Sequence, residues 1–362
     1  MSDLKRTPLY DIHATLGGQL VPFANWDMPV RYSSILDEAR AVRTNAGLFD
    51  VSHMGRIDIN GPDAETLLDG LYSSSIPKLK VGRGRYGVLC NESGGIIDDC
   101  ILYRFGADRF RLVPNASNTS AVLNWIHRWK TGTVEISDAT NKTAMIAHQG
   151  PESQSMLQGL TSFDLSSLKS FNFIECDIAG VAAIIARTGY TGEDGFEFMV
   201  QRDKAVKIWS ALSKQGAVPC GLGARDVLRL EAGLLLHGND MSPTINPYEA
   251  GLHRFVNPDR DGYIAREALT QIREAGTERK LIGFSMDGRG AVPRHGYTIM
   301  SGENRVGEVS SGSYSPTLDR NIGFGYVRTH YGTAGTRLTV DIRGRMTSIM
   351  VVPIPFYPLR EN

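Results

Sequence analysis

The chain has 362 residues, of which 41% are hydrophobic and 22% are charged, and its formal net charge is zero. This length exceeds what one ordinary hydrophobic core needs and predicts two or three domains. The neutral balance excludes the bulk positive field that nonspecific nucleic-acid binding requires. No apolar run approaches the roughly 18 to 20 residues of a membrane span. We therefore expect neither a nucleic acid nor a membrane as a partner.

The first residues and the cysteines indicate the compartment. Residues 1–6 precede no apolar stretch, which argues against a secretory signal. Cys90, Cys100, Cys176 and Cys220 form no Cys-x-x-Cys pair. We therefore expect free thiols and a cytoplasmic location.

Helical and strand-like patterns alternate in the first part of the chain. Residues 36–46 predict a helix that ends before Gly47, and a second helix starts at residues 61–63. Between them, residues 50–53 (Asp-Val-Ser-His) have the residue types of a hydrolase triad but lack the Gly-x-Ser-x-Gly elbow. We expect no serine hydrolase. Because the eight histidines show no metal-ligand spacing, we also expect no catalytic metal.

Two adjacent acids stand at the start of a predicted strand. Residues 81–90 and 96–104 indicate paired strands, and Asp98 and Asp99 lie in the second. Successive side chains of a strand point to opposite faces, so one carboxylate can reach solvent while the other faces a pocket or the core. An inward carboxylate is costly unless it is paired, which suggests a site. An exposed turn is the more common setting for such a Gly- and Asp-rich stretch.

Between residues 110 and 214, strand and helix patterns again alternate. A strand at 110–113 and an amphipathic helix at 118–130 give the region 53–136 an α+β character. After residue 140 the pattern restarts, with strands at 144–147 and 181–186 and helices from 150 and over 203–214.

Residues 188–197 combine three glycines with three acids and a tyrosine. Glycine permits positive φ or close backbone approach. The segment lacks the Lys-Ser/Thr of a phosphate loop, and its acids would repel phosphate. It better suits the binding of a neutral or cationic heterocycle whose N–H groups donate hydrogen bonds to a carboxylate. A tight turn between strands explains the segment equally well.

A helix predicted over residues 224–236 carries two arginines. Arg225 lies in its first turn, and Arg229 lies one turn later on the same face. A cation at a helix N-terminus opposes the helix dipole and so indicates a partner, namely Asp226, Glu231 or a ligand carboxylate. A buried salt bridge between two domains is an equally good interpretation.

The C-terminal part predicts an all-β unit. Short strand patterns are separated by Gly, Asn and Asp turns, which is typical of a β-barrel or sandwich. The predicted strands are 281–286, 297–300, 305–310, 322–328, 337–342 and 346–352.

These motifs together resemble the aminomethyltransferase, or T-protein, family of the glycine cleavage system over nearly the full length. The matching segments are residues 6–13, 21–30, 46–54, 94–99, 189–195, 221–226 and 311–318. The resemblance implies an α+β protein with three domains around a central opening that binds tetrahydrofolate. It implies a first domain formed by residues 1–52 and 137–240, with residues 53–136 inserted as an α+β domain. Residues 241–362 would form a β-barrel-like jelly roll.

The resemblance also implies the activity. The aminomethyl group on the lipoyl arm of the H-protein, a transient partner, would give 5,10-methylenetetrahydrofolate, ammonia and dihydrolipoyl H-protein, without a metal. The essential aspartate would be Asp99. The family's pterin-holding carboxylate matches Glu197, and its arginine matches Arg225. The other matches to the folate site are Tyr190, Asn115 and Tyr86.

Some positions depart from the family pattern, including Asn25 in place of Gly and His148 in place of Leu. They leave room for a changed donor. One alternative is a tetrahydrofolate-dependent demethylase of the same fold that acts on a methylated sulfonium, amine or aryl ether. Another is a non-catalytic folate-binding relative with a regulatory role, against which the combination of Asp99, Glu197 and Arg225 argues.

Overall fold

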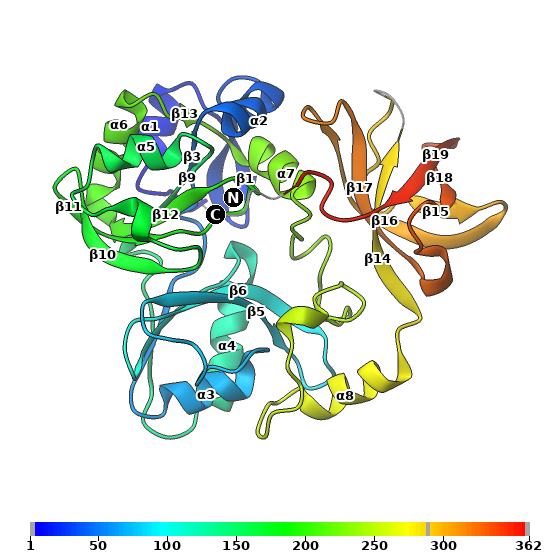
Figure 1. Cartoon of the computed structure of the whole chain (residues 1–362), viewed down its shortest axis with the longest axis horizontal. Coiled ribbons are helices and arrows are strands. Elements are labelled where there is room, and N and C mark those ends of the chain that lie inside the picture. Colours follow the sequence, from blue (N-terminus) through cyan, green and yellow to red (C-terminus); the bar gives the residue numbers. More distant parts are fainter. Residues whose placement is uncertain (1–3, 287–289, 359–362) are drawn as a thin grey trace.

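The computed structural model describes residues 4–286 and 290–358. Its ribbon forms three lobes, coloured blue to green at upper left, cyan below and orange to red at right (Figure 1). Mixed helices and strands combine with a closed C-terminal barrel, which confirms the predicted α+β class.

A six-stranded sheet forms the centre of the upper-left lobe. Its strands, in spatial order, are β10 (Phe173–Ile178), β11 (Val181–Ala186), β12 (Gly195–Gln201), β9 (Thr143–Gln149), β3 (Gly47–Asp50) and β13 (Val218–Pro219). Neighbouring strands are antiparallel, except that β13 runs parallel to β3. The all-buried pattern of β3 and β9 reflects coverage on both faces.

Helices cover both faces of this sheet. Buried residues of α5 (Ser153–Gln158) and α6 (Ala205–Lys214) pack in one apolar cluster. Those of α2 (Ile35–Thr44) and α7 (Leu222–Glu231) pack in another. The lobe also contains α1 (Tyr10–Thr15) and a hairpin of β1 (Gln19–Phe23) and β2 (Trp26–Arg31). Asn25 at the hairpin turn has φ 65°, a left-handed conformation that asparagine tolerates, so it can replace the family glycine.

The lower lobe is built on a five-stranded antiparallel sheet. Its strands, in spatial order, are β5 (Arg83–Cys90), β6 (Ile96–Arg104), β7 (Arg109–Val113), β4 (Ile57–Asn60) and β8 (Glu135–Asp138). Helices α3 (Ala64–Leu71) and α4 (Thr119–Trp129) bury their apolar stripes against it. Strand β5 is an edge strand of this sheet, and its outer side forms isolated bridges from Arg83 to Asn172 and from Leu89 to Tyr72.

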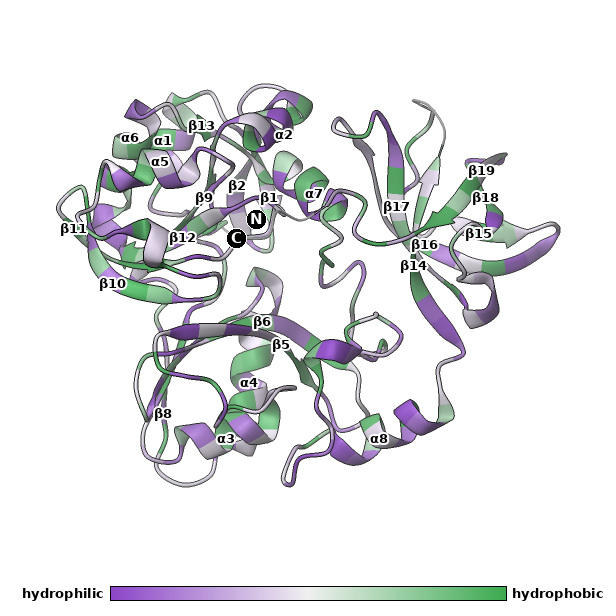
Figure 2. Ribbon diagram, viewed as in Figure 1, coloured by the Kyte–Doolittle hydropathy of each residue, from purple (hydrophilic) through white to green (hydrophobic). Residues whose placement is uncertain are grey.

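The right-hand lobe is a closed barrel. Its strands, in order around the barrel, are β14 (Arg279–Met286), β17 (Arg320–Arg328), β16 (Asn304–Ser315), β15 (Thr298–Ser301), β18 (Arg337–Ile342) and β19 (Arg345–Val352). The preceding segment contains the 3-10 helix η4 (His253–Phe255) and α8 (Arg266–Ala275). In Figure 2, α8 carries mostly hydrophilic colour, and Leu269 is its one buried residue. All four cysteines are free thiols, as expected.

The predicted end of helix 224–236 was wrong, because α7 ends at Glu231. Gly233 has φ 76°, and its N–H bonds to the carbonyl of Leu230 at 3.0 Å. The N–H of Leu234 bonds to the carbonyl of Arg229 at 2.8 Å. This pair of bonds is a Schellman motif, which terminates the helix. The apolar residues that suggested continuation lie in the turn beyond it.

Candidate active site

The two adjacent acids lie on opposite faces of β6. Burial alternates along the strand, and Asp98 shares the inner face with Cys100 and Leu102. Asp98 is 0% exposed, whereas Asp99 on the other face is partly exposed. Asp99 therefore faces the side of the sheet where the lobes meet, alongside Ile101 and Tyr103, which pack in the cluster that includes α7.

One amide side chain joins the two acids. The Nδ2 of Asn115 donates to Asp98 Oδ1 and to Asp99 Oδ1, each at 2.8 Å. The backbone N–H of Asn115 and the Nδ2 of Asn118 also donate to Asp98, at 2.9 and 2.7 Å. Asn118 in turn contacts the Nδ1 of His237 at 2.8 Å. Asp98 was one of the two candidate acids of the sequence. Asn118 and His237 were not predicted, because they are far apart in the chain and only the fold joins them.

The second acid also accepts a hydrogen bond from an aromatic residue. The hydroxyl of Tyr86 donates to Asp99 Oδ2 at 3.1 Å. Burial first, and then the nearby charge of Asp98, raises the pKa of Asp99 to about 7. Burial also raises the pKa of Asp98, against the opposing effect of its three N–H donors. The pKa of each acid is therefore raised, and that of Asp99 reaches about 7.

A second buried carboxylate lies on β12. Glu197 is 6% exposed and accepts a hydrogen bond of 2.6 Å from the hydroxyl of Thr188. That hydroxyl also contacts the Tyr103 hydroxyl of β6 at 3.1 Å, so the upper and lower sheets meet here. Burial raises the pKa of Glu197, and the charge of Arg225 partly offsets this. Thr188 and Tyr103 were missed, although Thr188 opens the glycine-rich segment singled out in the sequence.

The two arginines of α7 have different surroundings. The predicted partners of Arg225 are taken elsewhere, because Asp226 pairs with Arg229 and Glu231 pairs with Arg43. The guanidinium of Arg225 lies over the Tyr190 ring, 4.5 Å from its centroid. Its Nη1 is buried, and no hydrogen-bond partner for it is found in the described chain. Arg225 therefore has a buried donor that a ligand can use.

Tyr190 connects this arginine to the acidic pair. Its hydroxyl donates to the carbonyl of Leu235. Burial first raises the pKa of Tyr190, and the charge of Asp99 adds to the effect, so the phenol stays neutral near the carboxylate. The structure thus brings together all six residues singled out in the sequence, from five separate stretches of chain. They are Tyr86, Asp99, Asn115, Tyr190, Glu197 and Arg225.

No hydrolase triad forms at residues 50–53. The Asp50 carboxylate lies 2.9 Å from Nε2 of His13 rather than beside His53. The Ser52 hydroxyl donates to the carbonyl of Met145 at 3.1 Å. Burial lowers the pKa of His53 to about 3, so its ring is neutral at ordinary pH.

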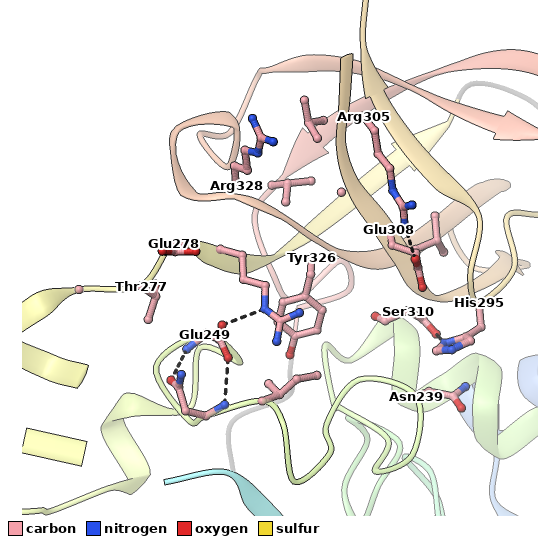
Figure 3. A pocket seen from close by; sticks show the side chains of 18 of the residues that line it. Asn239, Glu249, Thr277, Glu278, His295, Arg305, Glu308, Ser310, Tyr326 and Arg328 are labelled. Carbon is pink, nitrogen blue, oxygen red and sulfur yellow. Dashed lines mark hydrogen bonds and ion pairs between the residues drawn. The ribbon is translucent and has the colours of Figure 1, made fainter. Parts of the chain in front are cut away.

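A pocket of about 600 Å³ lies between the barrel and the segment that precedes it in the chain. Figure 3 shows its lining, with Arg305 joined to Glu308. Arg279 is likewise paired with Glu249 at 2.8 Å. None of the six site residues is among the described residues that line it. Its charges are largely neutralised by one another, and we do not assign the site to it.

The described residues offer neither a metal-binding cluster nor a membrane-spanning helix. Within residues 4–286 and 290–358, no group of three or more His, Cys, Asp or Glu side chains could hold a metal ion. Over the same ranges, no helix is long and apolar enough to cross a membrane.

Comparison with known proteins gives matches along the whole chain. Residues 9–260 match the family model described as GCVT N-terminal domain, and residues 279–358 match the glycine cleavage T-protein C-terminal barrel domain. An aminomethyltransferase of Halothermothrix orenii is 44% identical over 98% of this chain and 100% of its own length. An aminomethyltransferase of Rubrobacter xylanophilus is 46% identical over 99% of this chain and 96% of its own length.

A solved structure is also similar over its full length. The crystal structure of glycine cleavage system aminomethyltransferase T from Bartonella henselae superposes with a TM-score of 0.93 at 34% identity. The match covers 99% of each chain.

Proposed function

The chain belongs to the aminomethyltransferase family of the glycine cleavage system, and on that premise we propose how its residues perform the reaction. It is a one-carbon transferase of glycine cleavage. We propose that the donor is the aminomethyl group on the lipoyl arm of a transiently bound H-protein. We propose tetrahydrofolate as the acceptor.

One observation carries the proposed roles, namely a partly exposed carboxylate whose pKa is raised to about 7 between Tyr86, Asn115 and Asp98. The sulfur-bound CH2–NH2 group takes up a proton and loses ammonia, which leaves a cationic methylene. Folate N5 attacks this methylene and loses its own proton, and the lipoyl sulfur then leaves as a thiolate, so the new C–N bond replaces the C–S bond. A fixed carboxylate at Asp99 stabilises the positive charge that develops in both steps.

The same carboxylate can complete the reaction. Folate N10 closes the ring onto the cationic N5-methylene and loses its proton. Asp99 can accept that proton near neutral pH, because its pKa lies close to 7. The lipoyl thiolate takes up a proton and becomes dihydrolipoyl. The products are 5,10-methylenetetrahydrofolate, ammonia and dihydrolipoyl H-protein, so atoms and charge balance.

We assign the pterin to the other carboxylate. Thr188 occupies Oε2 of Glu197, which leaves Oε1 to accept from the N–H groups of an aminopyrimidine. The buried Nη1 of Arg225 can donate to the pterin carbonyl oxygen. The Tyr190 ring, held by its hydroxyl bond and by Arg225, offers an apolar wall between the two carboxylate sites.

The alternatives are not favoured. A demethylase of this fold or a non-catalytic regulatory relative would not explain full-length identities of 42–46% to proteins named aminomethyltransferase. The free thiols support a cytoplasmic location, which we include in the proposal.

A turnover assay tests the proposal. Purified protein is mixed with tetrahydrofolate and aminomethyl-loaded H-protein, and methylenetetrahydrofolate and ammonia are followed. We expect product only when all three components are present. Folate binding without turnover on this donor would instead favour a demethylase with another methyl donor. Absence of both binding and turnover would favour neither enzyme.

A further inference from the structure

The turn that follows α7 carries a histidine from the upper lobe to the acidic pair. In Figure 1 the chain descends from α7 toward the lower lobe. The Oδ2 of Asp240 accepts from the N–H of Leu236 at 3.0 Å and so fixes this turn. The carbonyl of Leu235, in the same turn, accepts the hydroxyl of Tyr190. His237 therefore lies on an ordered segment that already contacts the candidate site.

The ring of His237 makes two hydrogen bonds to the lower lobe. Its Nε2 lies 3.2 Å from the carbonyl oxygen of Ile96, and its Nδ1 lies 2.8 Å from the Nδ2 of Asn118. A carbonyl oxygen only accepts hydrogen bonds, so Nε2 carries the ring proton toward Ile96. The Nδ1 atom is then the acceptor for the amide of Asn118.

The surroundings of Asn118 determine which way its amide points. Its Nδ2 lies 2.7 Å from Oδ1 of Asp98 and 3.3 Å from the carbonyl oxygen of Ile97. Both oxygens are acceptors, so the nitrogen of the amide rather than its oxygen faces them. The Nδ1 of His237 adds a third acceptor on the same side. His237 therefore holds Asn118 in the orientation in which it donates to Asp98.

We propose that His237 is a positioning residue of the acidic pair, which acts through Asn118 to keep a negative charge on Asp98 beside Asp99. This inference rests on the proposed function, in which Asp99 accepts the proton. His237 is not among the groups assigned to folate or to the donor. Without it the Asn118 amide is free to turn, and Asp98 loses one of its three N–H donors. Asp98 then ionises less readily, and Asp99 ionises beside a neutral neighbour in more of the molecules.

Other titratable groups around the pair do not compete for this role. Burial raises the pKa of four of them, so they stay neutral near pH 7. They are Tyr72 after α3, Tyr86 of β5, Cys100 of β6 and Tyr190. The charged groups near Tyr190 are left unchanged in every variant compared below, and they are Arg225, Arg229 and Asp240.

NMR titration of the ligand-free chain, labelled with 13C at its aspartate carboxyls, tests the inference without turnover. Asp98→Asn and Asp99→Asn assign the two signals. In His237→Phe, which removes the acceptor but keeps a ring, the midpoint of Asp98 should rise by about one pH unit, the scale of one lost hydrogen bond to a charged group. The midpoint of Asp99 should fall, by no more than Asp98→Asn causes. Asn118→Ala removes the donor directly and should reproduce both changes. His237→Asn keeps an acceptor oxygen and should retain both wild-type midpoints, as should the exposed control His127→Phe on α4.

Turnover gives a second measurement. The apparent pKa of kcat/KM should fall in His237→Phe. It should fall no further in Asp98→Asn/His237→Phe than in Asp98→Asn alone, because His237 acts through Asp98.

Four results would overturn the inference. They are unchanged carboxyl midpoints in His237→Phe, an equal change in His127→Phe, a His237→Asn that behaves like His237→Phe, and a further fall of the apparent pKa in the double variant. If the wild type shows no turnover, the proposed function fails, and the carboxyl midpoints still decide whether His237 acts on the pair. Wild-type turnover with unchanged midpoints in His237→Phe would leave that function intact and remove His237 from it.

Discussion

Asp98 and Asp99 compete for ionisation at the start of β6. Asp98 accepts three N–H hydrogen bonds, from Asn115 and Asn118, which favour its charged form. Asp99 has fewer donors and stands beside that charge, and its pKa is raised to about 7. A carboxyl near its midpoint at neutral pH can accept a proton and return it at little cost. The two neighbours thus take different roles through their surroundings.

We predict that Asp99→Asn reduces turnover by about 10²–10³-fold, the scale of a lost electrostatic group in a transition state. Folate affinity measured by calorimetry should change little, because Glu197 and Arg225 remain. The variant should also melt at a higher temperature than wild type at pH 8. The folded pKa of Asp99 is raised above its unfolded value of ~4, so wild-type stability falls as pH rises through about 7.

Measurement at a lower pH is the control for the effect on stability. At pH 5, Asp99 is protonated in the folded wild type, so the difference in melting temperature between Asp99→Asn and wild type should be smaller than at pH 8. Turnover at the wild-type rate in Asp99→Asn would remove this residue from the mechanism, whatever its effect on stability.

A second prediction concerns pH dependence. We expect kcat/KM to rise with pH through an apparent pKa near 7 as Asp99 ionises. Asp98→Asn removes the neighbouring negative charge, so the apparent pKa of this rise in kcat/KM should fall by about one pH unit. The apparent pKa should stay above the ordinary carboxyl range, because burial is the larger cause of the raised pKa of Asp99. The exposed Asp203→Asn is the control, and an equal displacement in both variants would refute the coupling.

At the scale of elements, sequence periodicity located strands and helices, but it could not predict contacts between residues far apart in the chain. Strand β6 matches the predicted 96–104, because its alternation is regular and its turn is glycine-rich. The end of α7 was misplaced, because apolar spacing continues past the glycine that stops the helix. The contact between Tyr103 and Thr188, 85 residues apart, left no local signal. Asp99 and Glu197 could be located because motifs surround them.

Helix α7 links the site to the barrel, which gives a prediction about stability. Arg229 is buried, and its guanidinium contacts Asp240 at 2.6 Å and the Ser311 hydroxyl of β16 at 2.8 Å. Arg229→Ala leaves the Asp240 carboxylate buried without its cation, so we expect a loss of about 3–5 kcal/mol. Asp226→Ala removes the half-exposed partner of the same arginine and should cost less than about 1 kcal/mol. Urea denaturation measures both, and similar losses would contradict the buried pair's role.

At the scale of the whole molecule, one buried cluster joins the upper lobe to the barrel. Arg43 of α2 donates to Glu231 of α7 at 2.8 and 3.0 Å and pairs with Glu193 at 3.1 Å. Glu231 also accepts from the Ser315 hydroxyl of β16. The ring of Tyr357, beyond the last barrel strand, lies 4.2 Å from the Arg43 guanidinium. The lobes therefore share charged groups, whereas the boundaries near residues 52, 136 and 240 stay a prediction.

We predict that the lobes unfold together only while this cluster is intact. Arg43→Met leaves two buried carboxylates without their common cation and should cost about 3–5 kcal/mol. Adding Glu231→Met removes one of those carboxylates, so the double variant should lose less than the sum of the single losses, by about 1–3 kcal/mol. Calorimetry should show one transition for the wild type and a separate barrel transition for Arg43→Met. Additive losses with a single transition in every variant would mean that apolar packing alone couples the lobes.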